Sequence, residues 1–475
     1  MSVRLSLGVD RIVNPGKTGH QRIVDHAAKT AVCPAILIAA PASGQGKTTV
    51  VAALARLHTR RGLRVRVFKC GPDFLDPYWH TLASGAPVHQ LDLWMTGELD
   101  CCARLAAAAR EADFIIVEGV MGLFDGNPSA ADLAQRFGLP VLAVIDAGAM
   151  AGTFGALAFG LQRYRPGLRW AGVLANQVAS ERHADMLRSS VREPAQWLGA
   201  LMRNPAMSLP QRHLGLTVAS EVVDAQERLD AAADALAATP LGQMSGADLN
   251  RWDVAFEAGE DEGTLPTGVK PLAGRTVAVA RDAAFCFIYA ANLDCLQALG
   301  AQLIFFSPLV DSALPPCDAV WLPGGYPELH AARLSANTSL CDSLAAHVAQ
   351  HKPVWAECGG MMALFDALVT VDGEHLAQWG LLPGTVTMHK RLAALGPQQL
   401  VMNGRVLRGH TFHYSSCATP LAASFRTARP DSDPAPDAGE ALYQVGSIRA
   451  SYFHAWFASS ASATAALFAP GVNPS

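Results

Sequence analysis

The stretch Pro41-Ala42-Ser43-Gly44-Gln45-Gly46-Lys47-Thr48-Thr49 decides how the first part of the chain folds. It follows the apolar run Ala35 to Ala40, which predicts a buried parallel strand. It precedes Val50 to Arg61, where apolar residues recur at helical spacing until Gly62. A strand, a glycine-rich turn and a helix form the context of a P-loop, which binds phosphate groups. We therefore expect a nucleotide site, although Pro41 stands where the P-loop pattern begins with glycine.

The residue types in this loop suit the phosphates of ATP and a Mg²⁺ ion. Backbone N–H groups at a helix N-terminus can surround phosphate oxygens. Lys47 can reach the outer phosphates, and the Thr48 hydroxyl can ligate Mg²⁺. Asn176, at the end of a later strand, is placed either to read a base edge or to cap the next helix, the commoner fate of asparagine. The expected ATP-binding residues are Gly44, Gln45, Gly46, Lys47, Thr48, Thr49 and Asn176.

The composition is typical of a well-buried α/β protein. The chain has 475 residues, which is too long for one core, so two domains are expected. Half of the residues are hydrophobic and 16% are charged, and the formal net charge of −4 gives no sign of nucleic-acid binding. No apolar run approaches the roughly 20 residues of a membrane helix. Residues 1–33 carry no apolar signal segment, and we interpret them as a loose N-terminal extension.

The cysteine pattern predicts a reduced, cytoplasmic protein. Ten cysteines occur without a Cys-x-x-Cys pair, and no histidine cluster has the spacing of metal ligands. This argues against a zinc site and against a disulfide framework, and structural disulfides are rare in the cytoplasm.

Two further loops carry acidic residues at the ends of predicted strands. One is Lys69-Cys70-Gly71-Pro72-Asp73-Phe74-Leu75-Asp76-Pro77, and the other is Glu118-Gly119-Val120-Met121-Gly122-Leu123-Phe124-Asp125-Gly126. Ligands bind at the carboxyl ends of strands in open parallel sheets, and a carboxylate such as Glu118 beside a P-loop is the usual second anchor of Mg²⁺. The first loop is equally well explained as a rigid turn, because Gly-Pro-Asp is turn chemistry.

The order of predicted elements indicates two α/β domains. Strands and helices alternate through about residue 202, which predicts a mostly parallel, doubly wound sheet in a domain of residues 34–223. Residues 224–270 are rich in Ala, Asp, Glu and Gly with little β character, so we interpret them as a helix and a linker. A second α/β unit begins near Pro271 and gives a domain of residues 271–475.

The second domain contains a candidate nucleophile. The run Pro353-Val354-Trp355-Ala356-Glu357-Cys358-Gly359-Gly360 places Cys358 between a strand and a helix, the geometry of a nucleophile elbow. The earlier run Pro323-Gly324-Gly325-Tyr326-Pro327-Glu328 exposes backbone N–H groups that suit an oxyanion hole. The alternative is that Cys358 is one of ten small buried thiols. The paired glycines in both runs favour catalysis.

Four motifs follow one another along the first domain: the P-loop, Gly71 to Pro77 with His80, Glu118 to Gly126, and Leu209 to Leu216. Together they resemble the cobyrinic acid a,c-diamide synthase family. The second domain resembles the glutaminase domain of class I glutamine amidotransferases, in the variant fused to such synthases. The resemblance implies an N-terminal doubly wound P-loop NTPase domain and a C-terminal flavodoxin-like class I glutamine amidotransferase domain.

The same resemblance implies roles in the second domain. A thiolate needs a base, and the chain offers His410, His413 and His454. In this glutaminase variant the base lies near the C-terminus, which implies His454; the other two are equally well explained as structural or interface residues. The oxyanion hole around the nucleophile would be formed by the N–H groups of Gly325 and Gly359.

In the first domain, the resemblance implies the residues that hold metal and substrate. Mg²⁺ would be bound by Thr48, Asp73 and Glu118. The substrate would contact Lys69, Asp73, Phe74, Leu75 and Asp125.

Three positions depart from the family pattern. Phe74 stands where the family commonly has Tyr, and Thr411 where it usually has Glu. Many class I glutaminases carry Glu two residues after the histidine, where this chain has Trp456. The sequence therefore does not identify the group that orients His454.

The implied reaction is the ATP- and glutamine-dependent amidation of the a and c acetate carboxylates of cobyrinic or hydrogenobyrinic acid in cobalamin biosynthesis. It would proceed through acyl phosphates, with ammonia from glutamine hydrolysis. The expected partners are glutamine and a corrinoid, with neither nucleic acid nor membrane, and a homodimer is compatible with the sequence.

Two rival functions stay open at this point. The nearer one is cobyric acid synthase or another tetrapyrrole amidase. The other, from a different class, is a ParA/MinD-like switch ATPase. Such switches carry a signature Lys where this chain has Ala42, and a switch would not need a glutaminase.

Overall fold

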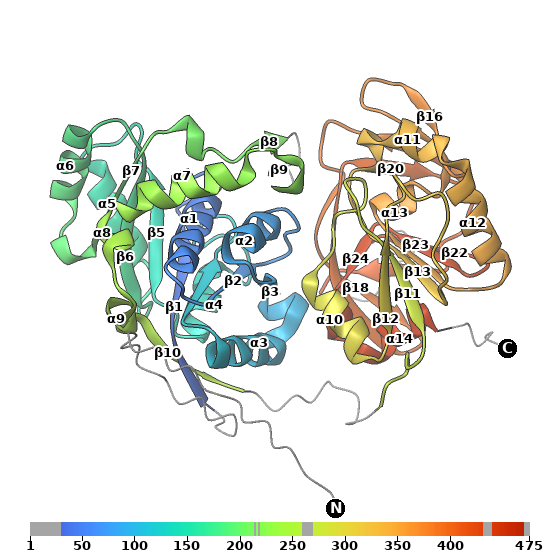
Figure 1. Cartoon of the computed structure of the whole chain (residues 1–475), viewed down its shortest axis with the longest axis horizontal. Coiled ribbons are helices and arrows are strands. Elements are labelled where there is room, and N and C mark those ends of the chain that lie inside the picture. Colours follow the sequence, from blue (N-terminus) through green and yellow to red (C-terminus); the bar gives the residue numbers. More distant parts are fainter. Residues whose placement is uncertain (1–29, 213–214, 217–218, 259–268, 431–438, 470–475) are drawn as a thin grey trace, which may run out of the picture.

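The structure is a computed structural model that describes residues 30–212, 215–216, 219–258, 269–430 and 439–469. Most of the predicted N-terminal extension (1–29), two residues of the fourth motif (213–214) and part of the predicted linker (259–268) lie outside the described residues. Two α/β halves lie side by side (Figure 1), and the chain passes once from the N-terminal to the C-terminal half.

The N-terminal half is built on an eight-stranded sheet. Its strands lie in the order β3 (His89–Leu91), β2 (Val65–Cys70), β4 (Phe114–Glu118), β1 (Thr30–Ala39), β5 (Val141–Asp146), β6 (Trp170–Val178) and β7 (Trp197–Met202). These seven strands are parallel to one another. The predicted doubly wound, mostly parallel sheet is therefore confirmed.

Helices cover both faces of this sheet. The longer ones are α1 (Lys47–Arg60), α2 (Asp76–Ser84), α3 (Glu98–Glu111), α4 (Ala130–Arg136), α5 (Thr153–Arg163), α6 (Glu181–Ser190) and α7 (Ala225–Ala237). Two single-turn helices, α8 (Pro240–Gln243) and α9 (Gly246–Leu249), follow α7, and a small ribbon of β8 (Gln211–Arg212) and β9 (Gly215–Leu216) precedes it.

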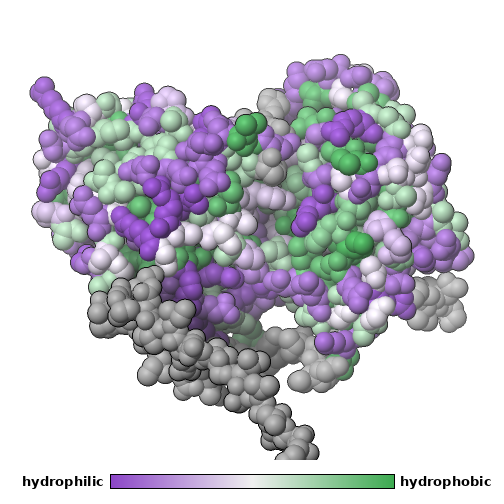
Figure 2. All heavy atoms as spheres, in the orientation of Figure 1, coloured by the Kyte–Doolittle hydropathy of each residue, from purple (hydrophilic) through white to green (hydrophobic). Residues whose placement is uncertain are grey.

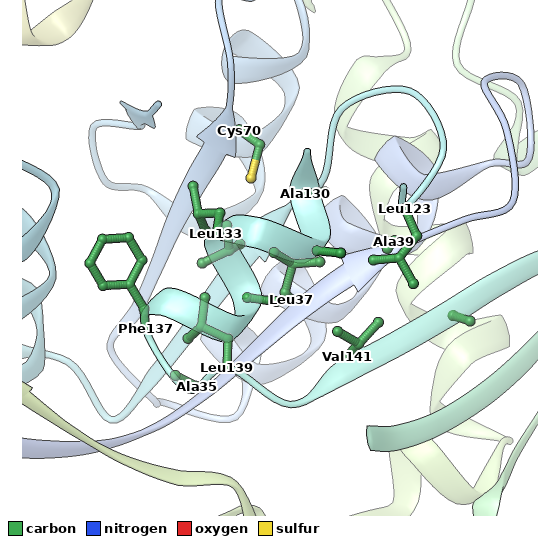
Figure 3. Packing of buried hydrophobic residues seen from close by; sticks show 14 of the residues in the cluster. Ala35, Leu37, Ala39, Cys70, Leu123, Ala130, Leu133, Phe137, Leu139 and Val141 are labelled. Carbon is green, nitrogen blue, oxygen red and sulfur yellow. The ribbon is translucent and has the colours of Figure 1, made fainter. Parts of the chain in front are cut away.

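Alternate residues of β1 serve the two faces. Ile36 and Ile38 pack with α1 and α7, whereas Leu37 packs on the opposite face with α3 and α4. Figure 3 shows Leu37 among Leu133, Phe137 and other apolar side chains of that face. A parallel strand that is buried on both faces is apolar throughout, which explains the unbroken apolar run from Ala35 to Ala40 before the P-loop.

The stretch interpreted as a linker contains a strand that the sequence analysis missed. β10 (Asp253–Glu257) pairs antiparallel with the first half of β1, so that Cys33 lies opposite Val254. Val254 and Phe256 are buried while Ala255 is exposed, which is the alternation of a half-buried strand. The run is short and lies among acidic residues, so its alternation is hard to recognise in the sequence. β10 extends the N-terminal sheet.

The C-terminal half contains a ten-stranded and a four-stranded sheet. The first has the order β12 (Gln302–Phe306), β11 (Thr276–Ala280), β13 (Ala319–Leu322), β14 (Val354–Glu357), β23 (Ile448–Ser451), β22 (Ala441–Val445), β21 (Phe425–Ala428), β18 (Ala394–Met402), β19 (Arg405–His413) and β24 (Phe453–Ala455). The second has the order β16 (His375–Ala377), β15 (Phe365–Val369), β17 (Leu382–Met388) and β20 (Ser415–Ala418).

Parallel pairing in the large sheet runs from β12 to β23, and the remaining pairs are antiparallel. The helices of this half are α10 (Ala290–Ala298), α11 (Ala331–Ala336), α12 (Thr338–Ala349), α13 (Gly359–Met362) and α14 (Ala461–Phe468). The parallel part brings the loops that follow β13 and β14 to one edge of the sheet, because carboxyl ends of parallel strands face the same way.

Polar contacts join the two halves. The Tyr78 hydroxyl donates to the carbonyl of Cys286 at 2.6 Å, and His89 Nε2 lies 2.8 Å from Asp294 Oδ2. Arg408 donates to the carbonyl of Thr96 at 3.1 Å. Figure 2 shows the halves as two bulges of one surface, with hydrophobic residues gathered on the viewed face of the C-terminal half.

Two further features concern the described residues. None of their helices is long and apolar enough to cross a membrane. All ten cysteines lie within the described ranges, and all are free thiols.

A matched pair of leucines tests the packing around α1. Leu54 is fully buried in this helix, whereas Leu99 on α3 is 43% exposed. We expect Leu54→Ala to lower the free energy of unfolding by about 2–5 kcal/mol, because it leaves a cavity. Leu99→Ala should change it by less than about 0.5 kcal/mol. Urea unfolding followed by circular dichroism measures both, and equal losses would contradict the packing described here.

Candidate active sites

The P-loop lies between β1 and α1 and depends on two glycines in a left-handed conformation. Gly44 has φ = +79° and Gly46 has φ = +91°. A Cβ on Gly46 would lie 2.1 Å from Nδ2 of Asn176, so a larger residue would collide with that side chain. The glycine pattern read from the sequence thus reflects backbone that other residues rarely adopt.

Lys47 begins α1 and points back over the loop. Its Nζ donates to the carbonyl of Met121 at 2.7 Å and to that of Ala42 at 3.2 Å. Burial lowers the pKa of Lys47, although Glu118 opposes this shift. These carbonyl contacts hold the ammonium group beside the space in which phosphates would lie.

Asn176 supports the P-loop from the end of β6. Its Nδ2 donates to the carbonyl of Gln45 at 2.9 Å, and Gln45 Oε1 accepts from the N–H of Asp146 at 2.8 Å. The amide donor of Asn176 is therefore used to fix the loop to the sheet. Asn176 does not cap the next helix, because Ser180 does so.

Three oxygen-bearing side chains converge beside the P-loop. The Thr48 hydroxyl donates to Glu118 Oε1 at 2.7 Å and lies 3.3 Å from Asp76 Oδ2. Such oxygens are the ligands that Mg²⁺ prefers, so this set fits a divalent cation. Within the described ranges, no group of three or more His, Cys, Asp or Glu side chains forms a metal site, and the Thr48 hydroxyl supplies the third donor here.

Lys69, on β2, supplies positive charge to this acidic cluster. Its Nζ lies 3.2 Å from Glu118 Oε1 and 3.5 Å from Asp73 Oδ2, and it pairs with Asp76. Burial alone would lower the pKa of Lys69, but the three carboxylates outweigh it and raise the pKa well above its usual value. Lys69 is therefore charged, and its first partners are these acids.

Glu118 ends β4 and is fully buried. Burial would raise its pKa, but Lys69 and His80 outweigh burial and lower it. His80, on α2, contacts Glu118 through Nε2 and is itself fully buried. The sequence analysis named His80 in a motif without giving it a role, and the structure places it behind Glu118.

Asp76 is the residue of this site that sequence reasoning missed. The sequence assigned the metal to Asp73, but Asp73 Oδ1 accepts from the backbone N–H groups of Leu75 and Asp76 and so stabilises its own turn. Asp76 begins α2, and its carboxylate is the one that faces Thr48. Pro77 was the available sequence signal. Proline favours the first turn of a helix, so Pro77 indicates that a helix begins at Asp76.

A cavity of about 710 Å³ opens above the P-loop. Its lining includes most residues expected to bind ATP: Gly44, Gly46, Lys47, Thr48, Thr49 and Asn176. Lys69, Asp73, Asp76 and Glu118 also line it. Asp125 does not, because its carboxylate accepts from the N–H of Gly122 within its own turn.

Cys358 connects β14 to α13 in a strained conformation. Its φ of +45° and ψ of −107° lie in a region that L-residues rarely adopt. Its N–H donates to the carbonyl of Ser451 at 2.7 Å, which holds the turn against β23. The side chain lines a cavity of about 250 Å³, and burial raises the pKa of the thiol. This is the predicted geometry of a nucleophile elbow, and a thiol of this kind needs a base.

The two predicted oxyanion glycines lie against each other. A Cβ on Gly359 would lie 2.9 Å from the N atom of Gly325, and a Cβ on Gly325 would lie 2.1 Å from the carbonyl oxygen of Ala284. Gly325 lines the same cavity as Cys358. The structure thus brings the N–H of Gly325 next to the elbow.

His454 lies on β24, opposite His410 of β19 in the strand register. The two imidazoles stack with ring centroids 5.0 Å apart, and both are buried. A Cβ on Gly324 would lie 2.5 Å from Cε1 of His454, so this glycine makes room for the ring. Burial, with His410 adding to it, lowers the pKa of His454 well below its usual value, which leaves the imidazole neutral.

His410 lines the cavity beside Cys358, and its Nδ1 lies 3.3 Å from the Tyr289 hydroxyl. His413 lines the same cavity, but both of its ring nitrogens lie near other partners. Its Nδ1 bonds the carbonyl of Ser415 at 2.8 Å, and its Nε2 lies 3.1 Å from Glu440 Oε1. The contacts of His413 with Ser415 and Glu440 therefore favour the structural interpretation of this residue.

Phe74 and Leu75 lie between the two halves. The Phe74 ring stacks on Tyr289 with centroids 4.2 Å apart and on Phe287 at 5.0 Å, and it lies 5.1 Å from the ring of His454. Leu75 packs on the same side, against Phe287. Neither residue lines the P-loop cavity, so these two of the predicted substrate contacts face the cavity beside Cys358 instead.

The loop that carries these residues connects the two cavities. Asp73 and Asp76 line both the cavity above the P-loop and the one beside Cys358. The side chains of a single loop therefore bound both sites.

Two family models match the chain. One, described as the CobQ/CobB/MinD/ParA nucleotide binding domain, matches residues 36–216, and the other, described as the CobB/CobQ-like glutamine amidotransferase domain, matches residues 276–462. Both expectations from the sequence, a nucleotide-binding first half and an amidotransferase second half, are thereby confirmed.

The chain is similar to a,c-diamide synthases of several bacteria along almost its whole length. A hydrogenobyrinate a,c-diamide synthase of Pseudomonas aeruginosa is 53% identical, with 92% of this chain and 98% of that relative covered. One of Stutzerimonas stutzeri is 55% identical, with 92% and 99% covered. A cobyrinate a,c-diamide synthase of Herminiimonas arsenicoxydans is 47% identical, with 92% and 97% covered.

Proposed function

The chain belongs to the family of hydrogenobyrinate and cobyrinate a,c-diamide synthases, and from this premise we propose how its two sites share one reaction. The reaction is the ATP- and glutamine-dependent amidation of the a and c acetates of hydrogenobyrinate or cobyrinate. A carboxylate is a poor electrophile and ammonium is no nucleophile, so one half must activate the acid while the other releases ammonia. The observation that carries the proposal is the loop whose Asp73 and Asp76 line both cavities.

The N-terminal site activates the carboxylate by phosphorylation. The P-loop N–H groups bind the phosphates, and Lys47 offsets charge that develops on the γ-phosphate. Thr48, Asp76 and Glu118 would hold Mg²⁺, which when bound supplies further positive charge beside the transferring phosphate. Lys69 lowers the pKa of the buried Glu118, which preserves that carboxylate as a ligand.

The C-terminal site releases ammonia from glutamine. The thiol proton of Cys358 moves to the neutral imidazole of His454, and the sulfur attacks the amide carbon. The N–H groups of Gly325 and Gly359 stabilise the resulting oxyanion. The imidazolium then returns the proton to the leaving nitrogen, and water hydrolyses the thioester to glutamate.

Ammonia must then reach the acyl phosphate without meeting bulk water, which would protonate it. Asp73 and Asp76, at the two ends of one loop, line both cavities, and Phe74 between them lines the cavity of Cys358. We infer that this loop borders the path of ammonia. The substrate contacts implied for Phe74 and Leu75 are replaced in this proposal by contacts with the glutaminase half.

The rival functions fit less well. The named relatives are a,c-diamide synthases, and the family to which they belong covers both halves of the chain. A ParA/MinD-like switch ATPase would not need the glutamine amidotransferase domain of the second half, with its elbow at Cys358.

The two activities should be separable. Wild-type protein incubated with ATP, Mg²⁺, glutamine and each corrinoid should give a diamide, identified by its mass. Cys358→Ala should lose this product with glutamine but retain it with ammonium chloride at alkaline pH, because only the thiol is removed. Cys341→Ala, at a cysteine outside both cavities, serves as the control. No product from ammonia in a folded Cys358→Ala protein would show that the thiol is not confined to glutamine hydrolysis.

Two aspartates of one loop test the metal site. Asp76→Asn should lower ammonia-dependent turnover by on the order of 100-fold, because it removes a charged ligand of the proposed metal site. It should also raise the Mg²⁺ concentration at which the rate is half-maximal. Asp73→Asn should retain most activity, because an asparagine oxygen can still accept from the N–H groups of Leu75 and Asp76. The measurement is initial rate against Mg²⁺ concentration, and the reverse order of losses would restore Asp73 as the ligand.

The aromatic ring of Phe74 should matter for coupling. Phe74→Ala removes the ring that packs on His454, Phe287 and Tyr289, so we expect more glutamate per amide than the one-to-one ratio of complete transfer. Phe74→Tyr keeps the ring and is the matched variant. Both products are measured in one reaction. If the ratio stays at one in Phe74→Ala, the loop does not border the ammonia path.

A further inference from the structure

We propose that the carboxylate of Glu357 is the group that positions His454 for its reaction with Cys358. The inference rests on the proposed glutaminase function. It concerns the question that the sequence leaves open, because the position at which many class I glutaminases carry their orienting Glu holds Trp456. No family motif in this sequence points to Glu357, which simply precedes the nucleophile.

Trp456 cannot replace the missing acid. Its indole is fully buried, lies 5.2 Å from the ring of Tyr289 and faces Arg104. An indole nitrogen carries a hydrogen and can only donate. It therefore cannot accept a hydrogen bond from the imidazole of His454, and the side chain serves the packing of the two halves.

Among the described residues, the acidic side chain that faces His454 is that of Glu357. Neither ring nitrogen of His454 has a hydrogen-bond partner among the residues that the structure describes, although the side chain is 1% exposed. The rings around it belong to Phe74, Phe287 and His410. The carboxylate of Glu357 lies on the remaining side, with Oε2 at 4.0 Å from Nδ1. A closure of about 1 Å would bring these two atoms into a hydrogen bond.

Glu357 is held rigidly from two directions. Its Oε1 accepts from Nε1 of Trp355 at 2.7 Å and from the N–H of Ala455 at 3.3 Å. Trp355 lies on the same strand as Glu357, and Ala455 is the residue after His454. The carboxylate thus ties the strand of the nucleophile to the strand of the base, and Oε2 is the oxygen that remains directed at the imidazole.

This arrangement gives each nitrogen of His454 one task. Nδ1 keeps its hydrogen and donates it to Glu357, so Nε2 has the lone pair that accepts the proton of Cys358. When that proton arrives, sulfur holds the negative charge and the imidazolium faces the carboxylate. Without the acceptor, the neutral ring would be free to carry its hydrogen on Nε2, where it could not act as a base.

The titration of the buried groups supports this role. Burial raises the pKa of Glu357 to about 8 and lowers the pKa of His454. Each group is therefore costly to charge alone, and both become easier to charge together, because opposite charges stabilise each other at low dielectric. Proton transfer from the thiol to the ring is favoured by this pairing.

The test is Glu357→Gln, because a glutamine oxygen can still accept from Trp355 and Ala455 while its NH₂ group cannot accept from Nδ1. We expect kcat for glutamine hydrolysis to fall on the order of 100-fold. The KM for glutamine and the ammonia-dependent rate should stay within about twofold, because neither substrate binding nor the synthetase site is changed. The rate at which a chloroketone analogue of glutamine alkylates Cys358 should fall in parallel with kcat.

Glu357→Asp keeps a carboxyl group but shortens the side chain by one methylene, and we expect an activity between those of Glu357→Gln and wild type. Unchanged kcat in Glu357→Gln would overturn the proposal. So would a loss of the glutamine and ammonia activities together, since Glu357 would then act in folding. A wild-type chain that uses neither nitrogen donor would instead refute the proposed function, which separates the two failures.

Discussion

The buried ammonium group of Lys69 is the charge on which the N-terminal site depends. Three carboxylates, those of Asp73, Asp76 and Glu118, lie around it at the end of a sheet whose interior is apolar. Buried like charges repel one another and are costly to desolvate, and Lys69 opposes both effects at Glu118, whose pKa it lowers. One lysine on β2 therefore allows Glu118 to remain ionised although its side chain is fully buried.

The loop after β2 connects the acidic cluster around Lys69 with the C-terminal half. Asp76 is fixed by Lys69, and two residues earlier the Phe74 ring is inserted among Phe287, Tyr289 and His454. Asp73 stiffens the loop through its bonds to the N–H groups that follow it. The segment between Lys69's partner Asp76 and the ring of His454 is therefore short and tightly bonded.

In the C-terminal half, one sheet carries four residues of the proposed glutaminase site. β14 ends at Glu357 and passes directly into Cys358, and the loop after β13 supplies Gly325. His454 comes from β24, at the far edge in strand order, but the sheet curls so that β24 approaches β14. The strained φ of Cys358 is tolerated because its neighbours are fixed by strand pairing on both sides.

The sequence by itself determined the P-loop, the elbow at Cys358 and the two α/β halves, because each depends on local order: an apolar strand, glycines in the turn, then a helix. It did not reveal β10, whose pairing with β1 joins distant segments. Nor did it reveal that Asp76, rather than Asp73 of the same loop, faces Thr48. The carboxylate beside His454 was equally hidden. Glu357 and His454 lie far apart in the chain, and only the folding of β14 and β24 against each other brings them within 4.0 Å.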